Sequence, residues 1–230
     1  MDPIPSPEKP KIVVADPVHA EGLAALQTWA NVTYTPDRAL IAQTPDAQAL
    51  VVRAPVTEEV LRTMPLLKAI VRCGAGIDGI PKAYADAHHI KVMNTPGANA
   101  DSVAEQVFAS VLEVLRDIAG FAKGMRAGDW QRRNQARTHS FELKGRRLGV
   151  LGMGAIGHRV AEIGHHGFGM PVQATLMTPR KLPDFVKVVD IDTLAKTSDV
   201  LVLCCSLNEA TRGRSEEHTS ELQSPCTISY

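Results

Sequence analysis

The amino-acid sequence predicts an α/β protein with two doubly wound parallel-sheet domains, the second of them incomplete. Three observations carry this prediction. Short apolar runs alternate with segments of helical periodicity, a pattern produced by parallel sheets that are covered on both faces. The alternation occurs in two series, and a glycine-rich turn follows the first apolar run of the second series.

The first series begins with the run KIVV at residues 11–14, which leads into Asp-Pro and so predicts a strand followed by a turn. Each later apolar run is separated from the next by a segment with helical spacing. The further strands are expected at residues 49–55, 68–76 and 90–97, and the helices between them at residues 19–30, 57–67 and 80–89.

The second series opens with one long helix, expected over residues 102–128. Apolar residues recur there every three or four positions, and a glycine lies near the end. A polar connector follows. The remaining segments are a strand, glycine turn and helix over residues 146–169, a strand at 171–179, a short strand and helix at 185–199, and a strand at 200–207.

Composition excludes several classes of partner. The chain has 25 Lys and Arg against 25 Asp and Glu, so it lacks the excess of cations that nucleic-acid binding needs. No apolar run approaches a membrane span, and the polar, Pro-rich start has no signal-peptide core, so we expect a cytoplasmic protein. The four cysteines form no CxxC pair and the paired histidines have no second ligand at metal spacing, so no metal site is expected.

The glycine turn GMGAIG predicts a Rossmann-like dinucleotide-binding site. Gly152 would allow the tight turn, Gly154 would let a pyrophosphate approach the backbone, and Gly157 would let helix and strand pack closely. The helix that follows would offer free N–H groups to the phosphates. The alternative is a tight strand–helix turn that binds nothing.

The next strand decides between NAD and NADP. NAD binding would require Asp or Glu near its end, but the segment VQATLMTPRK contains neither. Thr178 and Arg180 lie there instead and suit a 2′-phosphate, which favours NADP over NAD. Counting from Gly157 places the acid position nearer Leu176, so NAD stays open, and Arg180 can also belong to an ordinary solvated loop.

Four blocks together are more specific than the glycine turn alone: VRCGAGIDGI, VMNTPGANADSVAEQ, FELKGRRLGVLGMGAIGHRVA and SDVLVLCCSLNEATRG. Through them, residues 11–213 resemble the D-isomer-specific 2-hydroxyacid dehydrogenases, a family that includes phosphoglycerate dehydrogenase and glyoxylate/hydroxypyruvate reductase. The resemblance implies a substrate domain in residues 1–100, an incomplete NAD(P)-binding domain in residues 101–213, and an active site in the cleft between them. It also implies hydride transfer between NAD(P) and C2 of a small D-2-hydroxy or 2-oxo acid, and a homodimer at full length.

The resemblance also assigns roles outside the glycine turn. It implies that the loop Gly74-Ala75-Gly76 binds the substrate carboxylate through backbone N–H groups, and a glycine-flanked turn after a strand can itself form such a nest. An ordinary strand–helix turn is the alternative. Asn99 would lie near the substrate and nicotinamide, although it can equally cap the long helix. The other implied cofactor contacts are Val103, Ala155, Ile156, Cys205 and Ser206.

The sequence departs from the family pattern at three positions. Cys204 and Ser206 stand where the family often has His and Pro, and Pro81 stands where Asp is common. These departures affect the fine fit of the cofactor rather than the family assignment.

No catalytic residue is expected in this chain. The resemblance implies a catalytic Arg, His and Glu, all downstream of the segment ATRG that ends at Gly213. Residues 214–230, RSEEHTSELQSPCTISY, resemble a translated sequencing-library adapter; a genuine disordered polar tail is the alternative. We therefore expect no catalytic role for Glu216, Glu217 or His218, and no turnover by the chain.

Two other functions stay open beside an oxidoreductase. The family resembles corepressors that sense NAD(H) without turnover, although the neutral charge and the lack of an added interaction segment disfavour this. Another Rossmann enzyme, such as a methyltransferase, is disfavoured by the block NTPGANADSVAE.

Overall fold

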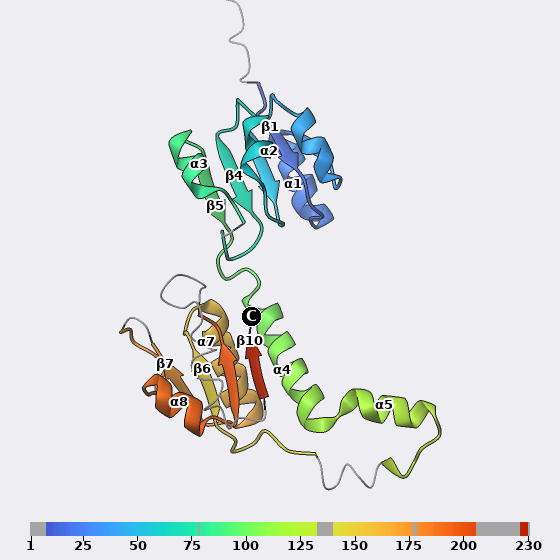
Figure 1. The fold of residues 1–230 in the computed structure, drawn as a ribbon, viewed down its shortest axis with the longest axis vertical. Coiled ribbons are helices and arrows are strands. Elements are labelled where there is room, and N and C mark those ends of the chain that lie inside the picture. The colour runs from blue at the N-terminus through green and yellow to red at the C-terminus, as the bar shows by residue number, and fades with distance from the viewer. Residues whose placement is uncertain (1–7, 78, 133–139, 177–178, 206–225, 230) are drawn as a thin grey trace, which may run out of the picture. The chain divides into compact units, whose positions relative to one another are not determined.

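The computed structural model describes residues 8–77, 79–132, 140–176, 179–205 and 226–229. The chain forms two compact units, residues 1–98 and residues 99–230. Figure 1 shows a sheet with flanking helices in each. No helix in the described residues is both long and apolar enough to cross a membrane. The α/β class and the parallel sheets predicted from the sequence are confirmed.

The first unit holds a five-stranded parallel sheet in the order β2-β1-β3-β4-β5. The chain runs from β1 outward to β2 and then back to β3 on the other side, so the topological switch point lies between β1 and β3. The strands are β1 (Lys11–Val14), β2 (Asn31–Tyr34), β3 (Ala49–Val52), β4 (Ala69–Arg72) and β5 (Lys91–Asn94). The helices are α1 (Ala20–Trp29), the 3-10 helix η1 (Arg38–Gln43), α2 (Glu58–Arg62) and α3 (Lys82–Ala87).

Both faces of this sheet bury apolar side chains because neighbouring strand residues point to opposite faces. Ile12 and Val14 pack on the face covered by α1, while Val13 packs on the face covered by η1, α2 and α3. The sequence analysis missed β2 as a strand. Its residues Asn31–Tyr34 are mostly exposed at the sheet edge, so the sequence shows no apolar run there.

The second unit holds another parallel sheet, in the order β10-β9-β6-β7-β8. The strands are β6 (Leu148–Leu151), β7 (Val172–Thr175), β8 (Val186–Val188), β9 (Val200–Leu203) and β10 (Cys226–Ser229). The helices are α4 (Ala100–Arg116), α5 (Ile118–Arg126), α7 (Ala155–Glu162), the π-helical segment η2 (Ile163–Gly167) and α8 (Ile191–Thr197). The main core lies between the sheet and helices α4 and α7.

Two segments differ from the expectation. The predicted single helix over residues 102–128 is two helices, because Asp117 takes a left-handed conformation (φ 47°) between α4 and α5. Asp tolerates this conformation better than most residues. Residues 214–230 were left out of the fold prediction because they resemble a translated adapter, yet Cys226–Ser229 pair with β9 in parallel register. An open strand edge offers unpaired N–H and C=O groups that an extended segment can satisfy.

Candidate functional site

The turn between β6 and α7 is shaped by close backbone contacts at Gly152. This residue has a φ of +97°, which side chains of L-residues rarely permit. A Cβ placed on it would lie 2.7 Å from the backbone nitrogen of Cys205 and 2.8 Å from its Cα. Glycine is therefore required where the turn passes the end of β9.

Gly157 brings α7 directly onto this turn. A Cβ at Gly157 would lie 2.1 Å from the carbonyl oxygen of Gly152 and 3.2 Å from Cγ1 of Val150. The helix can approach the end of β6 this closely only because Gly157 has no side chain. The sequence analysis assigned this residue the same packing role.

Gly154 differs from the other two glycines because it faces open space. It is the N-cap of α7, its φ of −75° suits any residue, and a Cβ there would meet no atom within 4 Å. The first N–H groups of α7, from Ala155 and Ile156, have no acceptor among the described residues. An open backbone beside free N–H groups at a helix start fits a pyrophosphate.

Arg180 lies beside the same turn. Its guanidinium Nη1 donates a hydrogen bond to the carbonyl of Met153, 3.0 Å away, although the two residues are far apart in sequence. The segment that connects β7 with Asp184 contains no carboxylate, and Leu176 is half-buried. The turn therefore has a nearby cation and no acidic neighbour from this segment. Thr178, predicted beside Arg180, lies outside the described residues.

Of the other residues predicted to contact the cofactor, some lie near the turn or at the start of α4, and one lies outside the described residues. Cys205 lies against the turn through its backbone, whereas Ser206 lies outside the described residues. Asn99 occupies the N-cap position of α4 but makes no side-chain cap bond. Val103 is half-buried in the first turns of α4. The start of α4 is tied to α7 by an ion pair between Asp101 and Arg159, with 2.5 Å between carboxylate and guanidinium.

Cys204 is a neutral thiol at neutral pH. Burial raises its pKa to about 12, with a smaller contribution from Cys205. A thiol with so high a pKa is neither a nucleophile nor a good metal ligand. Among the residues that the structure describes, no three His, Cys, Asp or Glu side chains are grouped to hold a metal ion.

The predicted carboxylate loop follows β4 in the first unit. The N–H of Gly74 already donates to Oγ1 of Thr95, 2.9 Å away. The carbonyl of Ala75 accepts a hydrogen bond from Asn94, and the carbonyl of Gly76 accepts one from Arg72; neither bond uses the N–H group of Ala75 or Gly76. Within the described ranges, these two N–H groups have no acceptor. They are the anion donors that this loop can offer.

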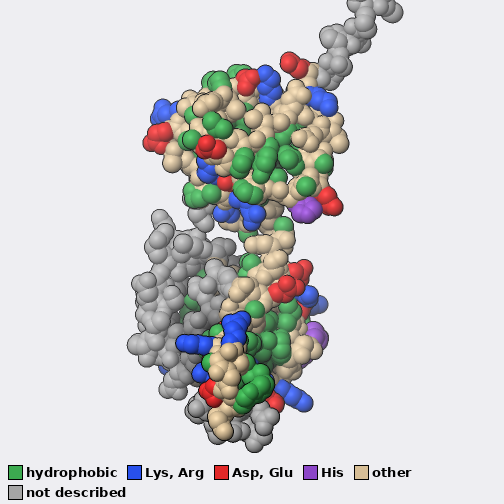
Figure 2. All heavy atoms as spheres, turned by 90° about the vertical axis from the view of Figure 1, so that its right-hand side faces the viewer, with side chains coloured by type: hydrophobic (Ala, Val, Ile, Leu, Met, Phe, Trp, Pro, Cys, Tyr) green, Lys and Arg blue, Asp and Glu red, His purple; other side chains and the backbone are tan. Residues whose placement is uncertain are grey.

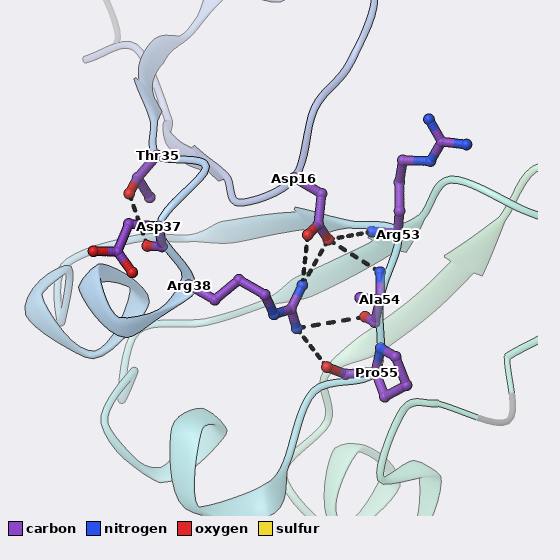
Figure 3. Close-up of polar contacts among 7 residues, drawn as sticks. All are labelled: Asp16, Thr35, Asp37, Arg38, Arg53, Ala54 and Pro55. Carbon is purple, nitrogen blue, oxygen red and sulfur yellow. Dashed lines mark hydrogen bonds and ion pairs between the residues drawn. The ribbon is translucent and has the colours of Figure 1, made fainter.

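Two polar features of the first unit escaped the sequence analysis. Arg72, at the end of β4, has a buried Nε without a hydrogen-bond partner among the described residues. Asp16, just after β1, is 8% exposed and bonded to Arg38 (Figure 3). The available signal was position: each polar residue lies at or just beyond the carboxyl end of a buried strand, where ligands of open α/β sheets bind.

Comparison with known proteins agrees with this geometry. Residues 108–224 match the family model of the NAD-binding domain of D-isomer specific 2-hydroxyacid dehydrogenases. The chain is 34% identical over 208 residues to hydroxypyruvate reductase of Thermotoga maritima, covering 88% of this chain and 67% of that protein. It is 33% identical over 211 residues to D-3-phosphoglycerate dehydrogenase of Methanocaldococcus jannaschii, covering 88% of this chain and 40% of that protein.

A solved structure shows the same fold. The NAD-dependent formate dehydrogenase of Staphylococcus aureus, in complex with NAD, superposes with a TM-score of 0.74 at 25% identity. The match covers 88% of this chain and 67% of the other. Together, the matched NAD-binding domain, the relatives and the glycine turn show that the chain belongs to the D-isomer specific 2-hydroxyacid dehydrogenase family.

Proposed function

We propose that the protein is an oxidoreductase of the kind that transfers a hydride between NAD(P) and C2 of a small D-2-hydroxy or 2-oxo acid. The observation that carries the proposal is the contrast among the three glycines. A turn that binds nothing needs Gly152 and Gly157, whose Cβ atoms would collide with backbone, but it has no steric need for Gly154. A pyrophosphate passing close to the backbone supplies that need.

We propose that the loop after β4 binds the carboxylate of the substrate. The N–H groups of Ala75 and Gly76, which have no acceptor among the described residues, suit a carboxylate, and Gly74 anchors the loop through Thr95. Asn99 is the proposed polar contact on the side of the nicotinamide, since its amide caps no helix N–H. The names of the relatives, hydroxypyruvate reductase and phosphoglycerate dehydrogenase, support a small hydroxy or oxo acid as substrate.

We propose that Arg180 makes NADPH the better ligand. The hydrogen bond from Arg180 to Met153 holds a cation next to the proposed phosphate-binding turn. The segment between β7 and Asp184 contains no carboxylate that could accept a hydrogen bond from a ribose hydroxyl. Replacing Arg180 with Ala should weaken NADPH binding more than NADH binding. Lys187→Ala, which removes an exposed cation from β8, is the matched control. Equal losses for both dinucleotides would contradict the assignment.

Dinucleotide binding by the chain itself tests the core of the proposal. NADH and NADPH are titrated into wild type, Gly154→Ala and Gly167→Ala by calorimetry. A Cβ at Gly167 would meet only Cγ2 of Ile163, at 3.9 Å, so this variant controls for the added methyl group. We expect binding by wild type and the control, and a loss of about tenfold or more, ~1.4 kcal/mol, in Gly154→Ala without loss of stability.

Two results would contradict the proposal: no binding by wild type, or equal binding by Gly154→Ala. We assign no proton-transfer residue in this chain and expect binding without turnover. Hydroxypyruvate and glyoxylate are the first substrates to assay in a longer version that retains the same two units. Binding without turnover of any 2-oxo acid there would favour an NAD(H)-sensing protein instead.

We also propose that the protein forms a homodimer through α5. This nine-residue helix has spaced apolar residues, but Gly124 is its sole buried residue. Ile118 and Met125 are each 50% exposed, and Trp130 after the helix is 67% exposed. Figure 2 shows hydrophobic side chains gathered on the face of the second unit that carries α5. An apolar helix face of this kind is stable when another surface covers it.

The charges around α5 do not oppose a second copy as the occupant. Asp117 at the start of the helix is paired with Arg132, 2.7 Å away, and Lys123 and Arg126 lie in the last turn. Two copies packed antiparallel about a two-fold axis would place the basic last turn of each helix next to the paired start of the other. The zero formal net charge of the chain adds no general repulsion between copies.

A further inference from the structure

We propose that Asp16 is a positioning residue for the proposed carboxylate-binding loop Gly74–Gly76. Together with Arg38 it holds the turn Arg53–Pro55 in place, and that turn supports the Gly74–Gly76 loop. The inference rests on the proposed function, because it takes that loop to be the carboxylate site.

Asp16 accepts hydrogen bonds from the N–H groups of the Arg53–Pro55 turn. One carboxylate oxygen accepts hydrogen bonds from the backbone nitrogens of Arg53, 2.6 Å away, and Ala54, 3.1 Å away (Figure 3). Asp16 directly follows Ala15, whose own N–H bonds to β3. A carboxylate at the end of β1 therefore bonds the first residues beyond β3, across the topological switch point.

Arg38 donates hydrogen bonds to the carbonyl groups of the same turn. Its Nη1 contacts both oxygens of Asp16, at 2.8 and 2.7 Å. Its Nη2 donates to the carbonyls of Ala54, 3.5 Å away, and Pro55. The turn is thus bonded on its donor side by a carboxylate and on its acceptor side by a guanidinium.

The Arg53–Pro55 turn contacts the segment after β4. Val56 donates its N–H to the carbonyl of Gly79, 2.8 Å away. A Cβ at Gly79 would lie 2.9 Å from Cα of Pro55, so the two backbones are in direct contact. Gly79 and Gly76 belong to the same short connection between β4 and α3. Movement of the Pro55 turn would therefore move the end of the loop whose N–H groups are free.

This pattern differs from a surface ion pair. Asp16 is buried, whereas the carboxylate of Asp86, which pairs with Lys82 on α3, is 59% exposed. Exposed pairs of that kind contribute little to stability. Asp16 and Arg38 instead satisfy backbone groups of a turn at the edge of the sheet where ligands of such folds bind. The hydrogen bonds of Asp16 and Arg38 therefore stabilise a turn whose position affects the proposed carboxylate-binding loop.

The test uses the full chain labelled with nitrogen-15. Oxamate, a stable analogue of a 2-oxo acid, is titrated into it and followed by NMR. The Kd is read from the amide shifts of Ala75 and Gly76, and hydrogen exchange is read at the Arg53 and Ala54 amides. The variants are Asp16→Asn, which keeps the shape but removes the charge, and Arg38→Lys, which keeps the charge but loses the two-pronged contact. Asp86→Asn is the control with the same charge change in the same unit.

We expect both variants to exchange faster at Arg53 and Ala54 and to bind oxamate about tenfold more weakly, with Asp86→Asn unchanged. Faster exchange or a lower melting temperature with an unchanged Kd would show that the pair only stabilises the fold, and would overturn the inference. Absence of any shift at Ala75 and Gly76 in wild type would overturn the carboxylate site itself, and the positioning role with it.

Discussion

Replacing Gly157 with Ala should separate α7 from the turn that it supports. The added Cβ would lie 2.1 Å from the carbonyl oxygen of Gly152 and 3.1 Å from its carbonyl carbon. Carbon–oxygen contacts in proteins lie at about 3.3–3.6 Å, so the helix must move by about 1 Å. The atoms that the Cβ meets at Gly152 are backbone atoms, so no side chain can rotate to relieve this contact.

Two opposing effects set the magnitude. Ala has a higher helix propensity than Gly, which favours the variant by about 1 kcal/mol. Overpacking of a close contact typically costs about 1–3 kcal/mol, and a backbone clash lies at the upper end. We expect a net loss of about 1–2 kcal/mol in the free energy of unfolding. Dinucleotide affinity should fall as well, because the N–H groups of Ala155 and Ile156 move with the helix.

Urea unfolding followed by circular dichroism gives the stability, and NADPH titration gives the affinity. Gly167→Ala is the control in the same unit, since its Cβ would meet only an ordinary contact at 3.9 Å. The reasoning is refuted if Gly157→Ala is as stable as this control, or if it binds NADPH as well as wild type does.

Three further predictions concern other parts of the chain. Burial alone would raise the pKa of Asp16, but Arg38 and the N–H groups of Arg53 and Ala54 bring it below the ordinary 3.8. The ionised carboxylate therefore stabilises the folded chain at neutral pH, and this contribution is lost as the pH falls below 3.8. Acid unfolding of wild type should therefore lose more stability over this range than that of Asp16→Asn, and parallel curves would contradict the assignment. Met125→Glu, which places a charge on the exposed face of α5, should give a monomer by light scattering where wild type dimerises, while Leu66→Glu on the other unit should not; a dimer in both would exclude α5 as the interface. Cys204, whose pKa burial raises to about 12, should resist iodoacetamide at pH 8 in the folded chain and react in urea, as peptide mass spectrometry can show; equal labelling in both would mean that the thiol is accessible.

Local sequence patterns predicted most of the strands and the turn between β6 and α7. β6 is buried along its whole length, so it appears in the sequence as a continuous apolar run. β2 does not, because an exposed edge strand has no apolar requirement. The break at Asp117 was also missed, since apolar spacing continues through it and only the backbone conformation changes.

The candidate site was partly predictable for the same reason. The spacing of the glycines is a local property and located the turn in advance. The contact between Arg180 and Met153 was not predictable as a bond, although the position of Arg180 near the site was. The pairing of Asp16 with the turn after β3 joins residues that are distant in the sequence.

The sequence alone determined the α/β class, the two-unit division near residue 100 and the glycine turn, because periodicity and short-range spacing reflect backbone geometry directly. Only the tertiary structure decided which glycine is free to face a ligand. Gly152 is closed in by the backbone of Cys204 and Cys205, just after β9, and Gly157 by the backbone of the turn itself, while Gly154 is open. That difference depends on which segments lie opposite each residue in space, and sequence spacing does not carry this information.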